Sequence, residues 1–349
     1  MRRVWKVSAL VGVGLLVQVM RERAALSRAA AMPDPWAATR PLSREGTRLV
    51  DIDDDVVLRV AERGSGQAVV CCPGWGLTLD TWSYLPRLLP GEVRLIAVDL
   101  RGHGGSSPVP PGGNLDLLAR DIARLLEALE ITDAVLVGHS FGGIVLQAFA
   151  VAHPDVMAER VRGLLLVSTM ARGVADIRTR LLARVLSSPG FTRLASSPRL
   201  SVMLARRSFV GDVPASRLEL TREAGDLGQG RREFNLAKLG DLSDRLRSIE
   251  APVTVLSGVD DPLTPVKDAV LLAEAIPGAR LRLLSDTAHL LPLENSEAVA
   301  EEVCRLLALD GSGGATFTRD VPPRRAASGL AWRRPREPRR RSRPHAGPS

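Results

Sequence analysis

Aromatic side chains are scarce in this chain: phenylalanine, tryptophan and tyrosine together make up 3% of its 349 residues. Hydrophobic residues nevertheless account for 45% of the sequence, which is enough for a sizeable buried core. That core must therefore consist mainly of leucine, valine, alanine and isoleucine. The length suits one large domain with appendages and is too great for a minimal domain.

Cysteine is also rare, and only Cys71, Cys72 and Cys304 are present. Because adjacent residues of a strand point to opposite faces, Cys71 and Cys72 are poorly placed to form a disulfide with each other. We expect all three to be small, buried hydrophobic side chains. The sequence shows no disulfide framework. Its histidines and thiols are not clustered at the spacing of metal ligands, so it implies no metal and no other cofactor.

The apolar run near the N-terminus, Val7–Met20, is short for a membrane span. Its 14 residues would extend about 21 Å as a helix, whereas the hydrocarbon core of a bilayer is roughly 30 Å thick. For residues 1–35 we favour an uncleaved, membrane-associating segment, with a cleaved signal peptide and a soluble N-terminal helix as the alternatives. The sequence therefore leaves localisation open between a membrane surface, export and the cytoplasm.

The net charge of +8 is unevenly distributed along the chain. Residues 311–349 carry a net charge of +8 and residues 1–35 carry +4, which leaves −4 for residues 36–310. A mildly acidic folded part argues against a nucleic-acid-binding surface, so we expect no nucleic-acid partner for it. The basic, proline-rich segment 311–349 has almost no apolar residue to bury and is predicted to be a disordered tail.

Short apolar runs alternate with helical patterns between about residues 48 and 310. Residues 48–60 alternate apolar and polar side chains around three aspartates, which predicts a β-hairpin. Further runs rich in valine, leucine or isoleucine are Ala68–Cys72, Val93–Val98, Ala134–Val137, Gly163–Val167, Val253–Leu256 and Arg280–Leu284. Such runs are typical of strands buried on both faces of a parallel sheet.

Helical patterns separate these runs at Leu115–Leu129, Phe141–Ala152, Lys267–Ala275 and Ser296–Leu309. Strands alternating with helices predict an α/β fold with a mainly parallel central sheet and helices on both faces. The alternation stops at residues 171–249, whose leucine, arginine and alanine content and three prolines predict a helical insertion. The core domain is thus predicted to comprise residues 36–170 and 250–310.

The segment Gly138–Gly142 carries the strongest chemical signal, with Ser140 at its centre. It directly follows a predicted strand and directly precedes a predicted helix. A sharp strand-to-helix turn lets a serine hydroxyl project from the backbone, and glycines on either side let the chains pass closely. The helix N-terminus also favours developing negative charge. Ser140 is therefore predicted to be a nucleophile, and the alternative is a serine that only caps a helix.

A serine nucleophile needs a base to remove its proton, and the chain has five histidines. His139 adjoins the serine and is expected to point away from it, while His103 lies in a glycine-rich turn. His153 lies at a predicted helix end and His345 in the tail. His289 lies in a loop between the last predicted strand and the last predicted helix, and it is the predicted general base.

A histidine base needs an acid that fixes its tautomer and stabilises its charged form. Asp261 follows the strand-like run Val253–Leu256, and open α/β sheets place their ligands at the carboxyl ends of strands. Its neighbour Asp260 is the competing candidate. We favour Asp261, which makes Asp260 an ordinary turn residue.

The order Ser140, Asp261, His289 resembles the α/β-hydrolase fold family, whose triad runs nucleophile, acid, histidine. Further segments resemble motifs of that family over residues 48–310: Pro73–Gly76 its oxyanion loop, Asp99–Ser106 its D-x-R-G-x-G-x-S turn, Gly258–Pro265 its acid-bearing segment and Ala288–Glu294 its histidine segment. This sequence departs from the family at Pro73, usually a histidine, and at Ala288, commonly a glycine. Neither departure removes a catalytic group, but Pro73 puts the shape of the oxyanion loop in question.

The resemblance also implies roles around the triad. The backbone N–H groups of Phe141 and Trp75 would form the oxyanion hole. Gly74, Trp75 and Leu290 would line the substrate pocket, although ordinary packing is an equal alternative for the Trp75 indole. Residues 171–249 lie where this family carries its cap. Their 15 basic against 8 acidic residues fit solvated helix faces, with an anionic substrate or lipid surface as the alternative.

These features predict an enzyme that hydrolyses carboxylic esters, hydrophobic ones above all, through an acyl-enzyme intermediate. A similar triad also serves lactone or C–C bond hydrolysis, acyl transfer and cofactor-free perhydrolysis, so these activities remain alternatives. A non-catalytic binding protein is disfavoured because no member of the triad is missing. The expected partners are a small-molecule ester and a membrane surface.

Overall fold

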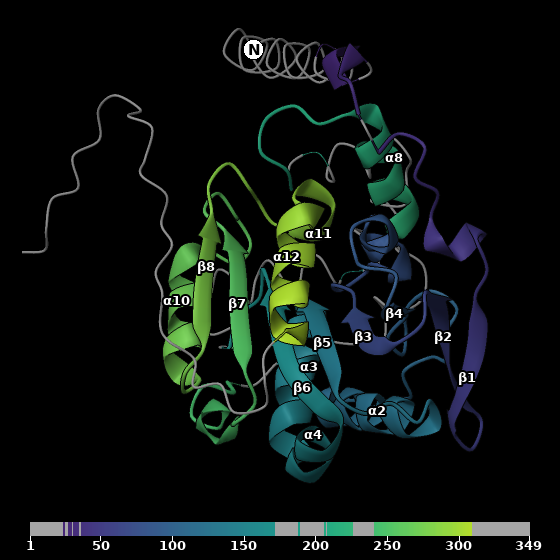
Figure 1. Ribbon diagram of the computed structural model, residues 1–349, viewed down its shortest axis with the longest axis vertical. Coiled ribbons are helices and arrows are strands. Elements are labelled where there is room, and N and C mark those ends of the chain that lie inside the picture. Colours follow the sequence, from purple (N-terminus) through teal and green to yellow (C-terminus); the bar gives the residue numbers. More distant parts are fainter. Residues whose placement is uncertain are drawn as a thin grey trace, which may run out of the picture.

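The structure is a computed structural model of the chain (Figure 1). It describes residues 24, 27–29, 31–34, 36–171, 188, 206, 208–225 and 241–308. The apolar segment 7–20 and the basic tail 311–349 lie outside the described residues, and the insertion 171–249 is described only in part. Among the described helices, none is by itself both long and apolar enough to cross a membrane; only one pair, bent by 103° at residue 153, meets that test together.

A sheet of eight strands forms the centre of the described structure, in the order β1-β2-β4-β3-β5-β6-β7-β8. Its strands are β1 (Arg48–Asp53), β2 (Val56–Arg63), β3 (Gln67–Cys72), β4 (Val93–Val98), β5 (Ala134–His139), β6 (Val161–Val167), β7 (Val253–Gly258) and β8 (Arg280–Leu284). β2 pairs antiparallel with both β1 and β4, and the other pairings are parallel. The predicted hairpin and the predicted mainly parallel sheet are confirmed.

Helices cover both faces of this sheet, as predicted (Figure 1). One face packs against α2 (Leu115–Ala128), α3 (Phe141–Ala152), α4 (Pro154–Arg160) and α10 (Val266–Ala275). The other packs against α12 (Ser296–Leu307) and the short 3-10 helices η1 (Leu42–Arg44), η2 (Leu79–Trp82) and η3 (Leu85–Arg87). Each face needs such a layer because successive strand residues point to opposite sides and both sets are apolar.

The two cysteines of β3 belong to these two different faces. Cys72 lies in one apolar cluster and Cys71 in the other, and both are fully buried. Burial raises the pKa of the Cys72 thiol to about 12, so this thiol stays protonated. Cys304 on α12 is only partly buried, so the prediction of a buried side chain is wrong there. It follows the buried Val303 by one position, which turns it away from the stripe that faces the sheet.

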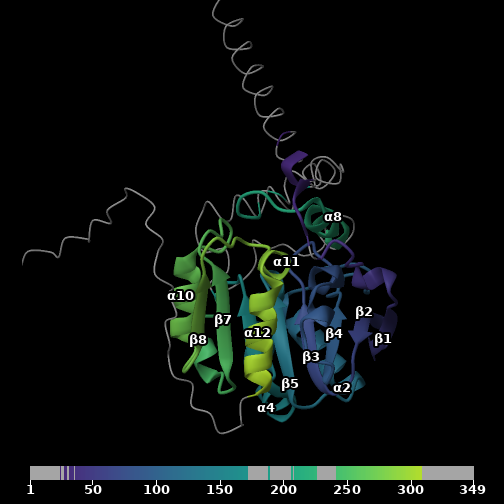
Figure 2. The same ribbon diagram turned by 45° about the horizontal axis from the view of Figure 1, so that its top comes forward.

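Within the insertion 171–249, the structure describes α8 (Ala215–Ala224) and the short helix η5 (Leu246–Ser248). Figure 2 shows α8 above one end of the sheet, beside the N-terminal residues that the structure describes. It packs against η2, which follows β3, and against α11 (Leu291–Glu294), which follows β8. A third apolar cluster joins this region to the N-terminal residues and includes Ala29, Tyr84, Phe209, Leu218 and Leu290.

Candidate active site

Ser140, the candidate nucleophile, occupies the turn between β5 and α3. Its φ of 50° and ψ of −114° lie outside the regions that non-glycine residues favour. The Ser140 N–H donates to the Val167 carbonyl at 2.9 Å, and the Thr169 hydroxyl donates to the Ser140 carbonyl at 2.7 Å. These two bonds, one to the end of β6 and one to the residues that follow it, hold the strained backbone in place.

Close packing around this turn leaves no room for side chains at its glycines. A Cβ atom on Gly142 would lie 2.6 Å from the Pro73 carbonyl oxygen and closer still to that of Cys72. A Cβ atom on Gly138 would lie 2.7 Å from the Gly143 nitrogen. The first turn of α3 therefore approaches the backbone that follows β3, which is the predicted oxyanion loop.

Ser140, His289 and Asp261 form one continuous row of hydrogen bonds. Ser140 Oγ lies 3.1 Å from His289 Nε2, and His289 Nδ1 lies 2.9 Å from Asp261 Oδ2. His289 and Asp261 are only 6% and 4% exposed, so water is largely kept from this pair. An ionised carboxylate can only accept, so Nδ1 carries the imidazole proton and Nε2 accepts from the Ser140 hydroxyl.

The acid of this row is Asp261, and Asp260 faces solvent. Asp261 accepts N–H bonds from Leu263 at 2.8 Å and Thr264 at 2.9 Å, and the Thr264 hydroxyl donates to it at 2.5 Å. Burial alone would raise the pKa of Asp261, but hydrogen bonds from His289 and Thr264 outweigh it and hold that pKa below its usual value. The carboxylate is thus ionised beside the imidazole. Asp260 is exposed and serves as a turn residue.

Trp75 and Phe141, the predicted oxyanion donors, lie on the two segments that meet at Gly142. Trp75 belongs to the loop after β3, which closes through a bond from the Leu77 N–H to the Gly74 carbonyl at 3.1 Å. Phe141 is the first residue of α3 and is buried. Both residues therefore belong to segments that follow the carboxyl ends of neighbouring strands, β3 and β5.

The loop after β3 is also tied to the insertion. Thr78 N–H donates to the Ala224 carbonyl at 2.8 Å, and Leu77 pairs with Gly225 in an isolated antiparallel bridge. The end of α8 thus contacts the segment that carries Trp75.

Gly74, a predicted pocket residue, faces the His139 ring, because a Cβ atom there would lie 2.9 Å from His139 Nδ1.

A comparison with known protein families matches residues 69–302 to the alpha/beta hydrolase family. That range contains Ser140, Asp261 and His289 in the order described above. The chain belongs to this family. The resemblance inferred from the sequence is therefore confirmed.

Relatives of this hydrolase cover most of its length. It is 29% identical over 252 residues to 3-oxoadipate enol-lactonase 2 of Acinetobacter baylyi, which spans 70% of this chain and 90% of that protein. It is 29% identical over 269 residues to a poly(3-hydroxyalkanoate) depolymerase of Ectopseudomonas oleovorans; the match covers 74% of this chain and 92% of that protein. A solved esterase structure from Exiguobacterium antarcticum has a TM-score of 0.66 at 23% identity, covering 75% of this chain and 99% of that chain. That structure shows a shared fold.

Two further histidines of the hydrolase contact the site, and the sequence did not indicate either role. His139 Nε2 lies 2.8 Å from the carbonyl oxygen of His289. Burial, with a smaller contribution from repulsion by His289, lowers the pKa of His139 to about 3, so its ring stays neutral. His103 Nε2 accepts the Gly76 N–H at 3.0 Å. The available signals were adjacency to Ser140 and the match of Asp99–Ser106 to a family motif.

Leu290 and Glu294 connect the histidine loop of the hydrolase to the insertion. Leu290 is 5% exposed and belongs to the apolar cluster shared with α8. The Glu294 carboxylate accepts the Ala288 N–H at 2.6 Å and the Val210 N–H at 2.7 Å. The segment around His289 therefore contacts residues of the insertion through Leu290 and Glu294.

The arginines of the insertion that the structure describes include several in ion pairs. Arg206 lies 3.0 Å from Asp212, and Arg222 lies 2.5 Å from Glu219. Arg217 stacks over the Tyr84 ring with its guanidinium carbon 5.7 Å from the ring centre. The two ion pairs fit the interpretation that the excess of arginine belongs to solvated helix faces, whereas Arg217 packs against an aromatic ring.

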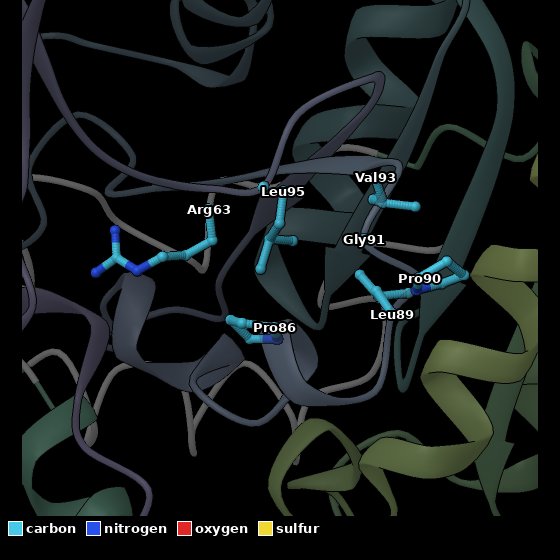
Figure 3. A pocket seen from close by; sticks show the side chains of 8 residues that line it. Arg63, Pro86, Leu89, Pro90, Gly91, Val93 and Leu95 are labelled. Carbon is cyan, nitrogen blue, oxygen red and sulfur yellow. The ribbon is translucent and has the colours of Figure 1, made fainter.

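A small cavity lies away from the triad (Figure 3). It is lined by Arg63, Gly64, Pro86, Leu89, Pro90, Gly91, Val93 and Leu95 and has a volume of about 60 Å³. Small-molecule sites usually measure several hundred Å³, and no triad or predicted oxyanion residue lines this cavity, so it is not the substrate pocket. Among the described residues, no group of three or more His, Cys, Asp or Glu side chains is arranged to hold a metal ion.

Proposed function

We propose that this hydrolase cleaves carboxylic esters, with Ser140 as nucleophile, His289 as general base and Asp261 as the supporting acid. The row of hydrogen bonds at 3.1 Å and 2.9 Å, starting from a serine in a strained strand-to-helix turn, carries this proposal. A base within hydrogen-bond reach of the nucleophile, and oriented by a third group, is the arrangement that activates a serine.

In the first half-reaction, Ser140 Oγ attacks the ester carbonyl carbon while its proton passes to His289 Nε2. Asp261, ionised and held by Thr264, stabilises the imidazolium that forms. Collapse of the tetrahedral intermediate breaks the bond to the alcohol oxygen, and His289 returns its proton to that oxygen. Water then attacks acyl-Ser140 in the same way and releases the acid.

The backbone N–H groups of Phe141 and Trp75 are the proposed oxyanion donors. The close approach of Gly142 to the carbonyls of Cys72 and Pro73 supports this pairing, because it joins the two segments that carry the donors. Phe141 lies at the N-terminus of α3, where the helix dipole favours negative charge. Each donor would contribute about 3 kcal/mol to stabilisation of the transition state.

Hydrophobic esters are the proposed substrate class. The apolar cluster that contains Leu290, next to His289, supports this choice, as does a relative named as a depolymerase of a poly(3-hydroxyalkanoate). Lactone hydrolysis is the second candidate, because one relative is named as an enol-lactonase and a lactone is a cyclic ester. Residues 171–249 are the proposed cap, supported by contacts of α8 with η2 and α11.

A membrane surface is the proposed setting for this activity. The apolar run 7–20 supports it. Arg28 and Ala29 follow that run closely in sequence; Arg28 bonds to Asp212, and Ala29 lies in the apolar cluster that includes Leu218 of α8. A membrane-associated hydrophobic ester would then reach the side of the molecule that carries the proposed cap.

Fluorophosphonate labelling of the full-length protein tests the proposed nucleophile. A fluorescent probe should label wild type and leave Ser140→Ala unlabelled, because the probe reacts only with an activated serine. The same preparations should hydrolyse p-nitrophenyl esters, with turnover reduced by at least about 10³-fold in Ser140→Ala. A profile over several acyl-chain lengths, with a lactone alongside, measures the preference between the two candidate substrates.

Ser65→Ala is the matched control, since Ser65 is exposed in the turn between β2 and β3. It should label and turn over like wild type. Well-folded wild-type protein that is not labelled and hydrolyses no ester or lactone would refute the proposal.

A further inference from the structure

His103 lies in the turn after β4 and reaches the loop that carries Trp75. Its Nε2 lies 3.0 Å from the Gly76 nitrogen, the residue directly after the proposed donor. His103 is 2% exposed, so this bond is shielded from water. Gly76 has a φ of +67°, a left-handed conformation that glycine adopts without a steric penalty.

The tautomer of His103 follows from its partners. A backbone N–H can only donate, so Nε2 must accept the bond from Gly76. The proton then lies on Nδ1, which is 3.3 Å from the Arg101 carbonyl oxygen, a group that can only accept. The ring is thereby fixed as a neutral acceptor aimed at the loop.

The same ring also faces the second proposed donor residue. The ring centres of His103 and Phe141 lie 6.2 Å apart with an angle of 30° between the planes. One side chain therefore contacts both segments of the proposed oxyanion hole: the Gly76 amide on one side and the Phe141 ring on the other.

The turn that holds His103 is rigidly anchored. Arg101 forms two bonds with Asp121 on α2, at 2.7 Å and 2.6 Å, and both side chains are buried. The Asp99 carboxylate accepts the Leu79 N–H at 2.8 Å and the Gly105 N–H at 3.0 Å. Leu79 follows the loop that carries Trp75. The turn therefore forms hydrogen bonds with this segment at two residues, Gly76 and Leu79.

We propose that His103 is a positioning residue that sets the distance between the two oxyanion donors, Trp75 N–H and Phe141 N–H. This inference rests on the proposed ester hydrolysis. A displacement of about 1 Å at a catalytic group can lower the rate by about 100-fold. His103 acts through the Gly76 amide and the Phe141 ring and has no part in proton transfer.

His103→Phe and His103→Gln separate the hydrogen bond from the packing. Phenylalanine keeps a ring against Phe141 but has no acceptor, whereas glutamine offers an amide oxygen near the former Nε2. Phenylalanine should lower kcat per fluorophosphonate-labelled site by about 10- to 100-fold, with KM within about twofold, because the donors act mainly on the transition state. Glutamine should restore kcat to within about threefold of wild type. Binding of an alkyl boronic acid, a tetrahedral mimic, should weaken by the same factor as kcat.

His153→Phe is the matched control, because its ring also stacks on a phenylalanine, Phe149, but lies away from the site. It should leave kcat unchanged. If His103→Phe fails to fold, His103→Leu is the second variant without an acceptor. Normalising to labelled sites removes losses due to misfolding, so a merely structural role would leave kcat per site near wild type and would overturn the proposal. Equal losses in the phenylalanine and glutamine variants would overturn it as well.

Amide hydrogen exchange at Gly76 tests the contact without relying on catalysis. The Gly76 amide should exchange at least about tenfold faster in His103→Phe than in wild type, while the strand amides of β5 stay unchanged. Wild type without any labelling or turnover would refute the proposed function. Unchanged exchange at Gly76 would refute the role of His103 whatever the activity.

Discussion

The three buried histidines of the site differ in which ring nitrogen carries the proton. His289 and His103 keep Nε2 as an acceptor, whereas His139 donates from Nε2 to the His289 carbonyl oxygen. Each tautomer is set by a group with a single role: the Asp261 carboxylate, the Gly76 N–H and a backbone carbonyl. The same side-chain type thus supplies the proposed base, an acceptor and a donor within one site.

His139 makes the folded state sensitive to acid. Burial, then repulsion by His289, lowers its pKa from 6.5 to about 3. Between these values the unfolded chain binds a proton that the folded chain does not, so stability falls as pH falls. Between pH 7 and pH 5 the free energy of unfolding should drop by about 2 kcal/mol more in wild type than in His139→Gln, as measured by urea denaturation.

Ser65→Ala provides the comparison, because Ser65 is exposed and its side chain does not titrate in this range. It should follow the pH dependence of wild type. Parallel stability curves for wild type and His139→Gln would contradict the lowered pKa of His139.

Sequence motifs predict residues whose chemistry depends on local context. Ser140 lies in a five-residue strand-to-helix motif, and Asp261 and His289 each follow an apolar run, so local pattern indicates them, with Asp260 as the competing acid. The contacts of His139 and His103 join residues 150 and 27 positions apart. Such contacts depend on which strands neighbour each other, and a single sequence does not encode that pairing in any local pattern.

The unit formed by β5, the Ser140 turn and α3 positions the proposed nucleophile. β5 is buried at each of its residues, between β3 and β6, and α3 packs behind it. The turn is tight because glycines stand where α3 approaches the backbone after β3. The position of Ser140 relative to the proposed oxyanion loop is therefore set by contacts between backbones.

Gly142→Ala tests this close approach. The added Cβ atom would overlap the carbonyl oxygens of Cys72 and Pro73, so α3 and the loop after β3 must separate. We expect the free energy of unfolding to fall by about 1–3 kcal/mol and kcat to fall by more than about tenfold. Thermal unfolding and ester turnover measure the two effects.

Gly91→Ala is the control for this change, because a Cβ atom at Gly91 meets nothing within 4 Å. It should change neither stability nor turnover appreciably. A Gly142→Ala protein that keeps wild-type turnover would show that the two segments move apart without consequence for the chemistry.

The buried strands and the longer helices of the fold were predictable, and the short helices were not. β4, β8 and α3 have the predicted bounds, because buried strands and amphipathic helices leave continuous patterns. α4 and α11 were not predicted; they span 7 and 4 residues and carry a proline in their first turn. Segments this short contain too few turns for a helical period to stand out from the surrounding loops.

Across the whole molecule, the described N-terminal residues join the insertion to the core. Arg28 pairs with Asp212 of the insertion at 2.5 Å. Trp36 packs against Tyr84, with ring centres 5.9 Å apart, and its indole N–H donates to Glu297 on α12 at 3.2 Å. These residues come from four distant parts of the sequence, so the N-terminal segment contributes to the stability of the proposed cap region.

Ala29→Asp tests this contribution. Ala29 is 2% exposed in the apolar cluster that contains Leu290, and a carboxylate there would be buried without a partner. The free energy of unfolding should fall by about 1–3 kcal/mol, as measured by thermal or urea denaturation. Ala31→Asp places the same charge two residues further on, at an exposed position, and should have little effect. Equal stability of both variants would contradict the docking of this segment.

The bridge between Leu77 and Gly225 defines where the insertion can be exchanged between related hydrolases. Because the Thr78 N–H donates to the Ala224 carbonyl, a chimera whose foreign segment replaces Ala224 and Gly225 would alter a contact of the loop that bears Trp75. We expect such a graft to change turnover together with substrate choice. The proposed cap and the proposed oxyanion loop would then have to be exchanged as one unit.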